Sequence, residues 1–210
     1  MNRPARIPIF PLDVVLFPGI PLPLHIFEER YKLMMRECME QRREFGVVMT
    51  RDDGVAAVGC TAAVLQVVKQ YPDGRMDILT VGRTPFQMSD VFDEKPYLEA
   101  DVEYLEDEPL QEDPASPGKL LDLYKQCYAI LHGRAAARLG GDGAPPGVPI
   151  TFLIASELPL DLEYKQELLE LRSETERQAS LREKMEKWLP QLEQLDNIKR
   201  RAGGNGNRPH

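Results

Sequence analysis

The sequence predicts an α+β protein in which a small mixed β-barrel with one inserted helix precedes a C-terminal helical bundle. Up to residue 105, apolar and polar residues alternate in short segments separated by turn-forming residues. Beyond residue 117 the apolar residues take helical spacing. An acidic, proline-containing stretch separates the two patterns. We therefore predict a barrel over 1–108, an acidic linker over 109–118, a helical subdomain over 119–200 and a disordered tail over 201–210.

A proline-rich apolar stretch opens the chain and organises the predicted barrel. Residues 7–10 favour a strand, and because Pro8 has no N–H to donate, we expect this strand to lie at an edge or to start there. The prolines from Pro11 to Pro23 fix the backbone and predict an extended, stiff loop. Because the loop is rich in leucine, valine and isoleucine, it must lie against a core or against a partner.

A helix is expected next, over residues 27–43, where the apolar spacing changes from two to three or four. Its apolar positions are Phe27, Tyr31, Met34, Met35 and Cys38. Acidic residues in its first turn and arginines near its end match the helix dipole. A buried strand is predicted to follow over residues 45–49.

Further strands complete the predicted barrel. Residues 57–69 are strand-compatible, residues 71–75 (Tyr-Pro-Asp-Gly-Arg) have the chemistry of a hairpin turn, and residues 76–82 alternate as a return strand. Strands are also expected from residue 83 and over 97–105. Short strands with turns at close spacing favour a closed or nearly closed barrel.

Helices are predicted for the remainder of the chain. One follows Pro117, and the glycine-rich residues 140–147 predict a flexible loop after it. A helix is expected to begin near Pro149 and another after Asp161, which has the chemistry of an N-cap. Ser173 to Glu176 matches a capping box, and the apolar stripe beyond it is better explained by packing within the chain than by a partner helix.

Composition and charge narrow the classes of function. The net charge of −8 argues against general binding to nucleic acid and against attraction to an anionic membrane surface. No apolar run approaches the roughly 20 residues that span a bilayer, and no apolar segment of a signal peptide follows the N-terminus, so we expect a cytoplasmic protein that does not enter a membrane. Three scattered cysteines predict neither a disulfide framework nor a zinc site.

Two strings near the N-terminus carry a family resemblance. PLDVVLFPG at residues 11–19 and PLHIFEERY at residues 23–31 resemble the N-terminal, substrate-binding domain of Lon-type ATP-dependent proteases. The resemblance continues at residues 58–64, 73–75 and 157–161, and so covers nearly the whole chain up to the tail. It is greatest to short bacterial proteins that carry this domain alone. It implies a PUA-like barrel and a bundle of helices after it.

The resemblance also implies a function, which is non-enzymatic binding of unfolded or tagged proteins and peptides. It leaves open the role of an adaptor in protein quality control that acts with a separate Lon-type protease, and it leaves the oligomeric state open. The residues agree with a binding role, since a stiff loop presents apolar side chains at a low cost in entropy.

We place the protein-binding site on the stiff loop and the adjoining barrel rim. Its predicted residues are Leu16, Phe17, Pro18, Ile20 and Leu22. Phe17, beside the Pro18–Gly19 turn, is expected to face outward. The alternative is that these side chains fill the end of the barrel and its junction with the helices.

Catalytic chemistry is not predicted. The chain has no Gly-x-x-x-x-Gly-Lys-Ser/Thr loop to hold phosphates, and nothing in it resembles the serine segment of the Lon peptidase. We therefore predict no ATPase or peptidase activity, no cofactor and no metal ion. His25 lies in the family string, and a structural hydrogen bond explains it better than a role as a general base.

Binding of RNA is the alternative function, because PUA-like barrels in other proteins bind RNA. Arg51, Arg75 and Arg83 are the residues that would form a local basic patch. The acidic charge balance and the lack of a basic stripe with interleaved aromatic residues argue against it.

Overall fold

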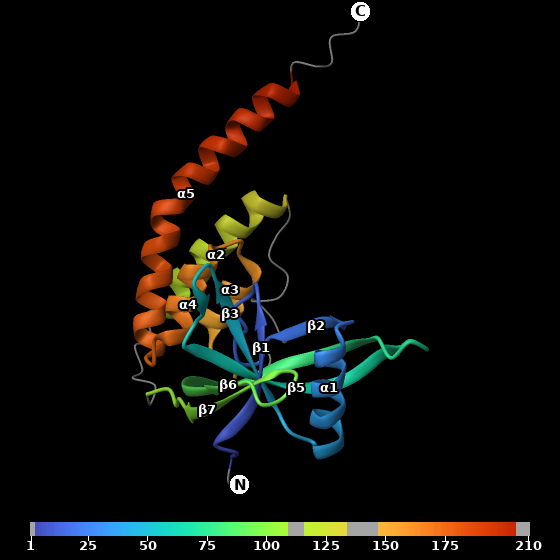
Figure 1. Cartoon of the computed structure of the whole chain (residues 1–210). Helices are drawn as coiled ribbons and strands as arrows, with labels where there is room; N and C mark the ends of the chain where they lie inside the picture. Colours follow the sequence, from blue (N-terminus) through green and yellow to red (C-terminus); the bar gives the residue numbers. More distant parts are fainter. Residues whose placement is uncertain (1–2, 109–115, 134–146, 205–210) are drawn as a thin grey trace, which may run out of the picture. The chain divides into compact units, whose positions relative to one another are not determined.

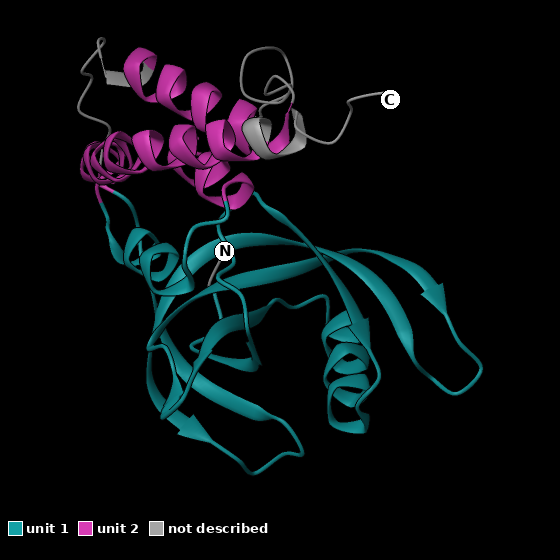
Figure 2. Cartoon of the chain, turned by 90° about the horizontal axis from the view of Figure 1, so that it is seen from above, with its two compact units in different colours: residues 1–107, 159–172 teal, residues 108–158, 173–210 magenta. Residues whose placement is uncertain are grey.

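The computed structural model describes residues 3–108, 116–133 and 147–204. Contacts divide the chain into two compact units. Unit 1 consists of residues 1–107 and 159–172, and unit 2 of residues 108–158 and 173–210 (Figure 2).

Unit 1 is built on a closed ring of strands, which confirms the predicted α+β barrel. The strands of the ring are β1 (Arg6–Leu12), β3 (Phe45–Arg51), β5 (Val58–Gln70), β6 (Met76–Phe92) and β7 (Leu98–Tyr104). Their order is β1-β7-β6-β5-β3, and β3 pairs back to β1 (Figure 1). The β1–β3 pair is parallel and the other pairs of the ring are antiparallel, so the barrel is mixed. Two shorter strands, β2 (Pro21–Ile26) and β4 (Gly54–Val55), pair with β6 and β3 respectively.

Long, irregular strands allow so small a ring to close. The β5–β6 register shifts at three places, and each such irregularity bends and twists the strands more sharply than regular pairing does. The centre of the barrel is filled by Ile7, Ile9, Val48, Phe86 and Ala100. A Cβ on Gly46 would lie 2.5 Å from the Phe86 ring, so the absence of a side chain there makes room for this aromatic residue.

The prediction that β1 lies at a sheet edge or starts at Pro8 is wrong, because β1 begins at Arg6 and pairs on both sides. It pairs with β7 over Arg6–Ile9 and with β3 over Ile9–Leu12. Among the described strands, Pro8 therefore pairs only with β7, and Pro11 pairs only with β3. β7 pairs with the first half of β1, and β3 pairs with the second half. Each proline therefore has a partner strand on one side only, which is why two prolines are tolerated in one strand.

The predicted stiff loop is shorter than expected. β1 continues to Leu12 and β2 takes up Pro21–Ile26, so only residues 13–20 connect them. Gly82 N donates to Ile20 O at 3.0 Å, which turns Ile20 toward β6. The backbone groups of successive strand residues point to opposite sides, so the nitrogens of Pro21 and Pro23 point away from β6. A missing N–H costs no hydrogen bond there.

The inserted helix α1 (Glu29–Gln41) starts later than the predicted residue 27. β2 extends to Ile26, so the chain enters the helix only after Glu28. Tyr31, Met34, Met35 and Cys38 are buried as predicted, whereas Phe27 lies outside the helix and is 59% exposed. α1 lies beside the β5–β6 hairpin, where Lys32 Nζ donates to Asp73 O at 3.0 Å (Figure 2).

Helix α4 (Leu162–Glu170) belongs to unit 1, although the sequence placed it in the helical subdomain. Gln166 Nε2 donates to Val58 O at 2.9 Å, and Arg51 pairs with Glu163 at 2.8 Å. These contacts tie α4 to β5 and β3 of the barrel. The predicted N-cap of the helix is confirmed, since Asp161 Oδ1 accepts from Tyr164 N at 2.8 Å.

Unit 2 consists of α2 (Ser116–His132), α3 (Ile150–Glu157) and α5 (Glu174–Gly204). Its buried apolar residues are Leu120, Tyr124, Cys127, Phe152, Ile154, Ala155, Leu158, Leu181, Met185 and Leu192. Arg177 is fully buried, with Nε 3.0 Å from Glu174 Oε2 and its guanidinium 4.4 Å from the centre of the Phe152 ring. Thr151 Oγ1 also donates to Glu174, so this buried pair has several partners, as buried charges require.

The predicted linker and tail fall partly outside the described residues. Residues 109–115 of the linker, the glycine-rich residues 140–146 and residues 205–210 of the tail lie outside them. Residues 201–204, which were expected to belong to a disordered tail, are the last residues of α5. Cys38, Cys60 and Cys127 are free and buried. Among the described residues, every helix is too short or too polar to span a bilayer.

Candidate functional site

The predicted site residues do not form one exposed surface. Leu16 is 3% exposed and Phe17 is 1% exposed, so the expectation that Phe17 faces outward is wrong. Pro18, Ile20 and Leu22 are half-buried, and their binding role stays a prediction. The backbone explains the burial of Phe17, since Gly19 N donates to Gly82 O at 2.9 Å and holds the loop against β6.

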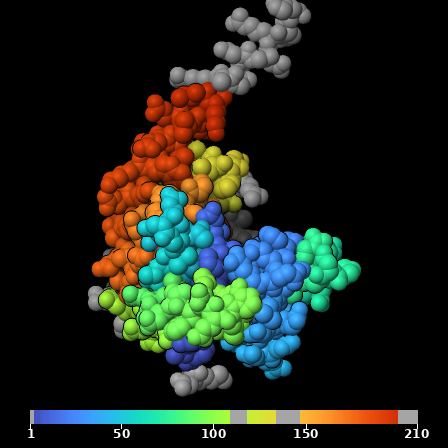
Figure 3. Space-filling model, in the orientation of Figure 1, coloured from blue at the N-terminus to red at the C-terminus, as the bar shows by residue number. Residues whose placement is uncertain are grey.

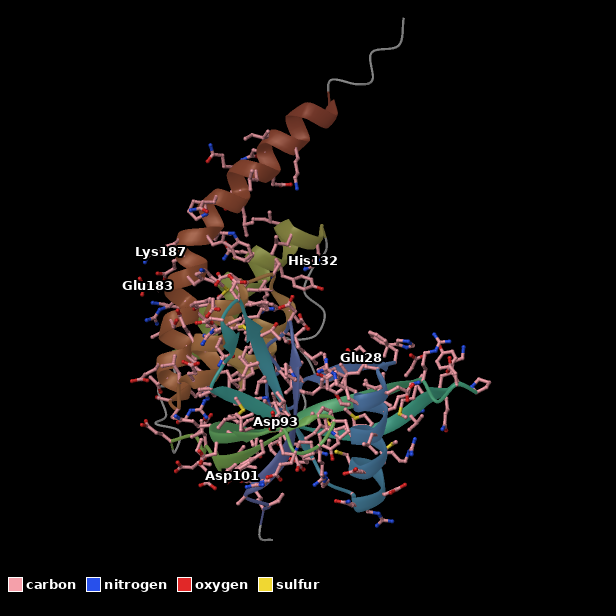
Figure 4. All side chains as sticks on the ribbon, in the orientation of Figure 1. Glu28, Asp93, Asp101, His132, Glu183 and Lys187 are labelled. Atoms are coloured by element: carbon pink, nitrogen blue, oxygen red, sulfur yellow. The ribbon has the colours of Figure 1, made fainter. Side chains whose placement is uncertain are left out.

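An apolar groove lies beside this loop, at the end of β2. Its volume is about 360 Å³, and its walls come from β1, β2, the start of α1, the end of β3 and the start of β7. Its lining residues are Phe10, Pro11, Leu12, Leu24, His25, Ile26, Phe27, Glu28, Arg30, Tyr31, Thr50 and Leu98. Glu28, which Figure 4 labels at the junction of β2 and α1, is one of these lining residues.

Two strands of the groove wall have a single pairing partner where they line it. Among the described strands, β1 pairs only with β3 over residues 10–12, and β2 pairs only with β6. Both singly paired stretches contribute lining residues to the groove. The Phe10 and Tyr31 rings, with centroids 4.2 Å apart, join the β1 wall to α1.

Phe27 is the most exposed large apolar side chain of the groove, at 59%. Its ring stacks on His25, with centroids 5.9 Å apart and planes inclined by 22°. His25 Nδ1 lies 2.5 Å from Asp77 Oδ1, and Tyr71 OH donates to Asp77 Oδ2 at 2.9 Å. These hydrogen bonds hold the pKa of the Asp77 carboxyl below its usual value, and the bond from His25 contributes more than the bond from Tyr71. His25 and Asp77 lie opposite each other in the β2–β6 pairing, so their hydrogen bond links the two strands. It also orients His25, on which the Phe27 ring stacks.

His25 has the structural hydrogen bond that its sequence position predicted. Its side chain is 46% exposed, and its partner is a carboxylate at the surface. β2 and α1 lie against the tip of the β5–β6 hairpin, which carries Tyr71 (Figure 3). The hairpin therefore supports this edge of the groove.

Polar residues of the groove pair with one another or with close neighbours. Arg30 Nε donates to Glu28 Oε2 at 2.8 Å, and Thr50 Oγ1 donates to Asp13 Oδ1 at 2.6 Å. The charges at the rim are thereby compensated, and most of the lining that remains is carbon. Such a groove favours an apolar ligand over a charged one.

The three arginines proposed for an RNA-binding patch are engaged separately. Arg51 pairs with Glu163 at 2.8 Å, and Arg75 pairs with Asp73 at 2.7 Å. Arg83 lines a second hollow, away from both of these pairs. A patch made of these three residues is therefore not formed. Within the described residues, no cluster of histidine, cysteine, aspartate and glutamate has the geometry of a metal site.

Comparison with known proteins gives one consistent family. Residues 6–187 match the family model of the ATP-dependent protease La (LON) substrate-binding domain. The chain is 29% identical to a Lon protease of Anaeromyxobacter dehalogenans, in an alignment that covers 80% of this chain and 21% of the relative. It is 26% identical to a Lon protease of Flavobacterium johnsoniae, over 93% of this chain and 26% of the relative. The chain thus spans about a fifth to a quarter of the length of these relatives.

Two solved structures share the fold. A Lon N-terminal domain protein from Xanthomonas campestris superposes with a TM-score of 0.64 at 24% identity, covering 84% of this chain and 96% of that one. The N-terminal domain of a Mycobacterium avium complex Lon protease gives the same TM-score at 17% identity, covering 86% and 98%. At these identities the two structures support the fold alone.

Proposed function

The chain belongs to the Lon substrate-binding domain family, and from that premise we propose that unit 1 binds extended apolar segments of other proteins in the groove beside Phe27. The observation that carries the proposal is the open apolar groove itself, with Phe27 held 59% exposed at its edge. Exposed apolar surface of this kind is unfavourable in water unless a partner covers it.

The groove suits part of a polypeptide chain. Its volume of about 360 Å³ is at the lower end of the range for small-ligand pockets, so it accommodates a few apolar side chains and not a folded domain. An unfolded or partly unfolded protein exposes such side chains, whereas a folded protein buries them. The groove would then select polypeptide segments by their apolar content and by their extended backbone.

We extend the proposal to the wider role of the protein. The chain would act as a protein-binding module, without ATPase or peptidase activity of its own, that collects unfolded or tagged proteins in protein quality control. A separate Lon-type protease is the partner that fits this role. Cleavage of casein by the purified chain, lost on a single serine substitution, would contradict the non-enzymatic part of the proposal.

The site is tested by titrating the protein against fluorescently labelled casein, an unfolded protein, and following fluorescence anisotropy. Phe27→Ser should weaken binding about tenfold, the effect of removing roughly 1.4 kcal/mol of apolar contact. It should leave the melting temperature nearly unchanged, because the side chain is mostly exposed.

Val91→Ser is the matched control. Val91 is 53% exposed on β6 and does not line the groove, so this variant loses exposed apolar surface elsewhere. Its affinity for casein should match that of the wild type. Equal affinities of the Phe27→Ser and Val91→Ser variants would show that the groove is not the binding site.

A further inference from the structure

A second hollow of unit 1 differs from the groove in its chemistry. It has a volume of about 520 Å³ and lies between the end of α1, the start of β3 and the adjoining parts of β5 and β6. Its lining includes four arginines, Arg3, Arg42, Arg43 and Arg83, but only one acidic residue, Glu44. We propose that this arginine pocket binds a phosphate-bearing ligand of about the size of a nucleotide.

The charge of the pocket is only partly compensated by acidic neighbours. Arg43 has carboxylate partners, at 3.5 Å from Glu37 and 3.7 Å from Glu99. Within the part of the chain that the structure describes, neither Arg42 nor Arg83 forms an ion pair. The whole chain carries a net charge of −8, so a concentration of cations at one hollow is not a consequence of its composition.

The other charged residues of the pocket leave this excess in place. Arg3 lies over the Tyr104 ring, 5.1 Å from its centre, a contact that brings no opposite charge to the guanidinium. Glu44 Oε2 accepts a hydrogen bond from Thr61 Oγ1 at 2.6 Å. Burial raises the pKa of the Cys38 thiol to about 11, so this thiol is uncharged and does not neutralise the arginines.

The backbone at Arg42 gives an independent indication. Arg42 has φ of 50° and is the one residue other than glycine with positive φ in the described chain. Its backbone N–H donates to Cys38 O and Met39 O and caps the C-terminal end of α1. Glycine is the most favourable residue at this position. A long cationic side chain in a conformation that disfavours it is a feature found at functional sites.

Arg43 contributes a buried guanidinium nitrogen to the same wall. Its Nε has no nitrogen or oxygen acceptor among the described atoms, and the neighbouring Cys38 thiol, which interacts with the guanidinium, is a weak acceptor at most. The dipole of α1 favours cations at its end and accounts for some of the charge at Arg42 and Arg43. It does not account for Arg83, which β6 contributes, or for Arg3 near the N-terminus.

The arrangement selects phosphate over carboxylate. A carboxylate is satisfied by a single guanidinium in a two-bond contact, whereas a phosphate group offers three oxygens and up to two charges to several of them. Met39, Ala63 and Val64 provide an apolar wall, which suits an organic group joined to the phosphate. The volume of about 520 Å³ falls within the range of pockets that hold small organic ligands.

Free nucleotides and the phosphorylated end of an RNA strand share this chemistry. Isothermal titration of the full-length chain with pyrophosphate, AMP, and one oligoribonucleotide with and without a 5′-phosphate separates them. If AMP binds more tightly than either RNA strand, the ligand is a free nucleotide. If the 5′-phosphorylated strand binds more tightly than AMP and than the unphosphorylated strand, the ligand is an RNA end. Both outcomes support the pocket. Equal binding of the two strands together with no binding of AMP or pyrophosphate would overturn the phosphate assignment.

Two variants locate the site. Arg83→Gln should weaken pyrophosphate binding at least tenfold, because a hydrogen-bonded charge pair is lost. Arg42→Gly should weaken it similarly while it keeps or raises the melting temperature, because glycine takes positive φ without strain. A purely structural role of Arg42 would give no change in binding.

Arg36→Gln is the matched control. Arg36 is exposed on α1 and does not line the pocket, so its replacement removes the same charge from the same helix. Binding should stay within twofold of the wild type. If Arg36→Gln and Arg83→Gln weaken pyrophosphate binding equally, the effect is one of general charge and the pocket is not the site.

Discussion

Phe17 and Phe27 lie in one apolar stretch of the sequence, yet one is 1% exposed and the other 59% exposed. Phe17 lies in the connection that Gly82 holds against β6, and its side chain is enclosed. Phe27 follows the last residue of β2 and precedes α1, so neither a strand face nor a helix face covers it. The difference shows that the stretch has two uses, as part of the core in its first half and as a surface in its second.

The two halves of the stretch are also held in place by different kinds of contact. Residues around Phe17 depend on close backbone approach, since a Cβ on Gly82 would lie 2.1 Å from Phe17 O. Residues around Phe27 depend on a side-chain hydrogen bond, between His25 and Asp77. The first contact lies at the buried Phe17, and the second lies at the surface. Stability and binding should therefore respond to different substitutions.

The largest expected effect is on stability, from Phe17→Ala. Removing a fully buried phenylalanine side chain should lower the free energy of unfolding by about 3–5 kcal/mol. Urea unfolding followed by circular dichroism measures it, with Phe27→Ala as the control, expected to cost less than about 1 kcal/mol. The affinity of the folded fraction for casein should be kept in Phe17→Ala. Similar losses of stability in the two variants would remove the distinction between core and surface.

The second expected effect comes from Gly82→Ala. The added methyl group meets backbone atoms of Phe17 at 2.1 and 2.9 Å, so the loop must move away from β6. We expect a loss of about 1–3 kcal/mol in the free energy of unfolding, as for other overpacked sites.

Gly118→Ala is the control for this substitution. A Cβ on Gly118, which lies in α2, meets no atom within 4 Å. Since alanine favours a helix over glycine by up to about 1 kcal/mol, this variant should be as stable as the wild type or more so. Unchanged stability of Gly82→Ala in urea would contradict the close approach of loop and strand.

The smallest expected effect concerns Asp77 and the pH dependence of stability. Its folded pKa is below the ordinary value of 3.8, so it contributes stability that is present above that value and is lost as pH falls through the lowered pKa. Asp77→Asn cannot titrate and should show a flatter decline of the urea midpoint below about pH 4. It should also weaken casein binding, by less than Phe27→Ser does, because His25 loses its partner. A wild-type slope in the variant would show that another carboxyl is responsible.

Much of the barrel was predictable because its signals are local. The turn chemistry of residues 71–75 and the alternation on both sides of it predict the β5–β6 hairpin, which the structure contains. The helical spacing of Tyr31, Met34, Met35 and Cys38 predicts the buried face of α1. The bounds of α1 were less accurate, because the pairing of β2 with β6 continues to Ile26 and delays the helix.

The candidate site was predicted only in part. The sequence directed attention to the apolar stretch, and the groove does lie at one end of it. It misplaced the exposed aromatic residue, since a helical pattern that includes Phe27 treats it as core. The closeness of Glu28 and Glu29 to the helix start was the available signal that Phe27 lies before the first turn and not within it.

By itself, the sequence determined the α+β class, the family and the order of strands and helices, since these depend on spacing between near neighbours. Tertiary structure alone decided which strands meet. The parallel pairing of β1 with β3 closes the ring, and the attachment of α4 to β5 joins residues 159–172 to the barrel. The groove and the arginine pocket likewise combine residues that are distant in the chain, such as Tyr31 with Leu98 and Arg42 with Arg83. Such contacts depend on how apolar faces pack in three dimensions, and no local pattern encodes that.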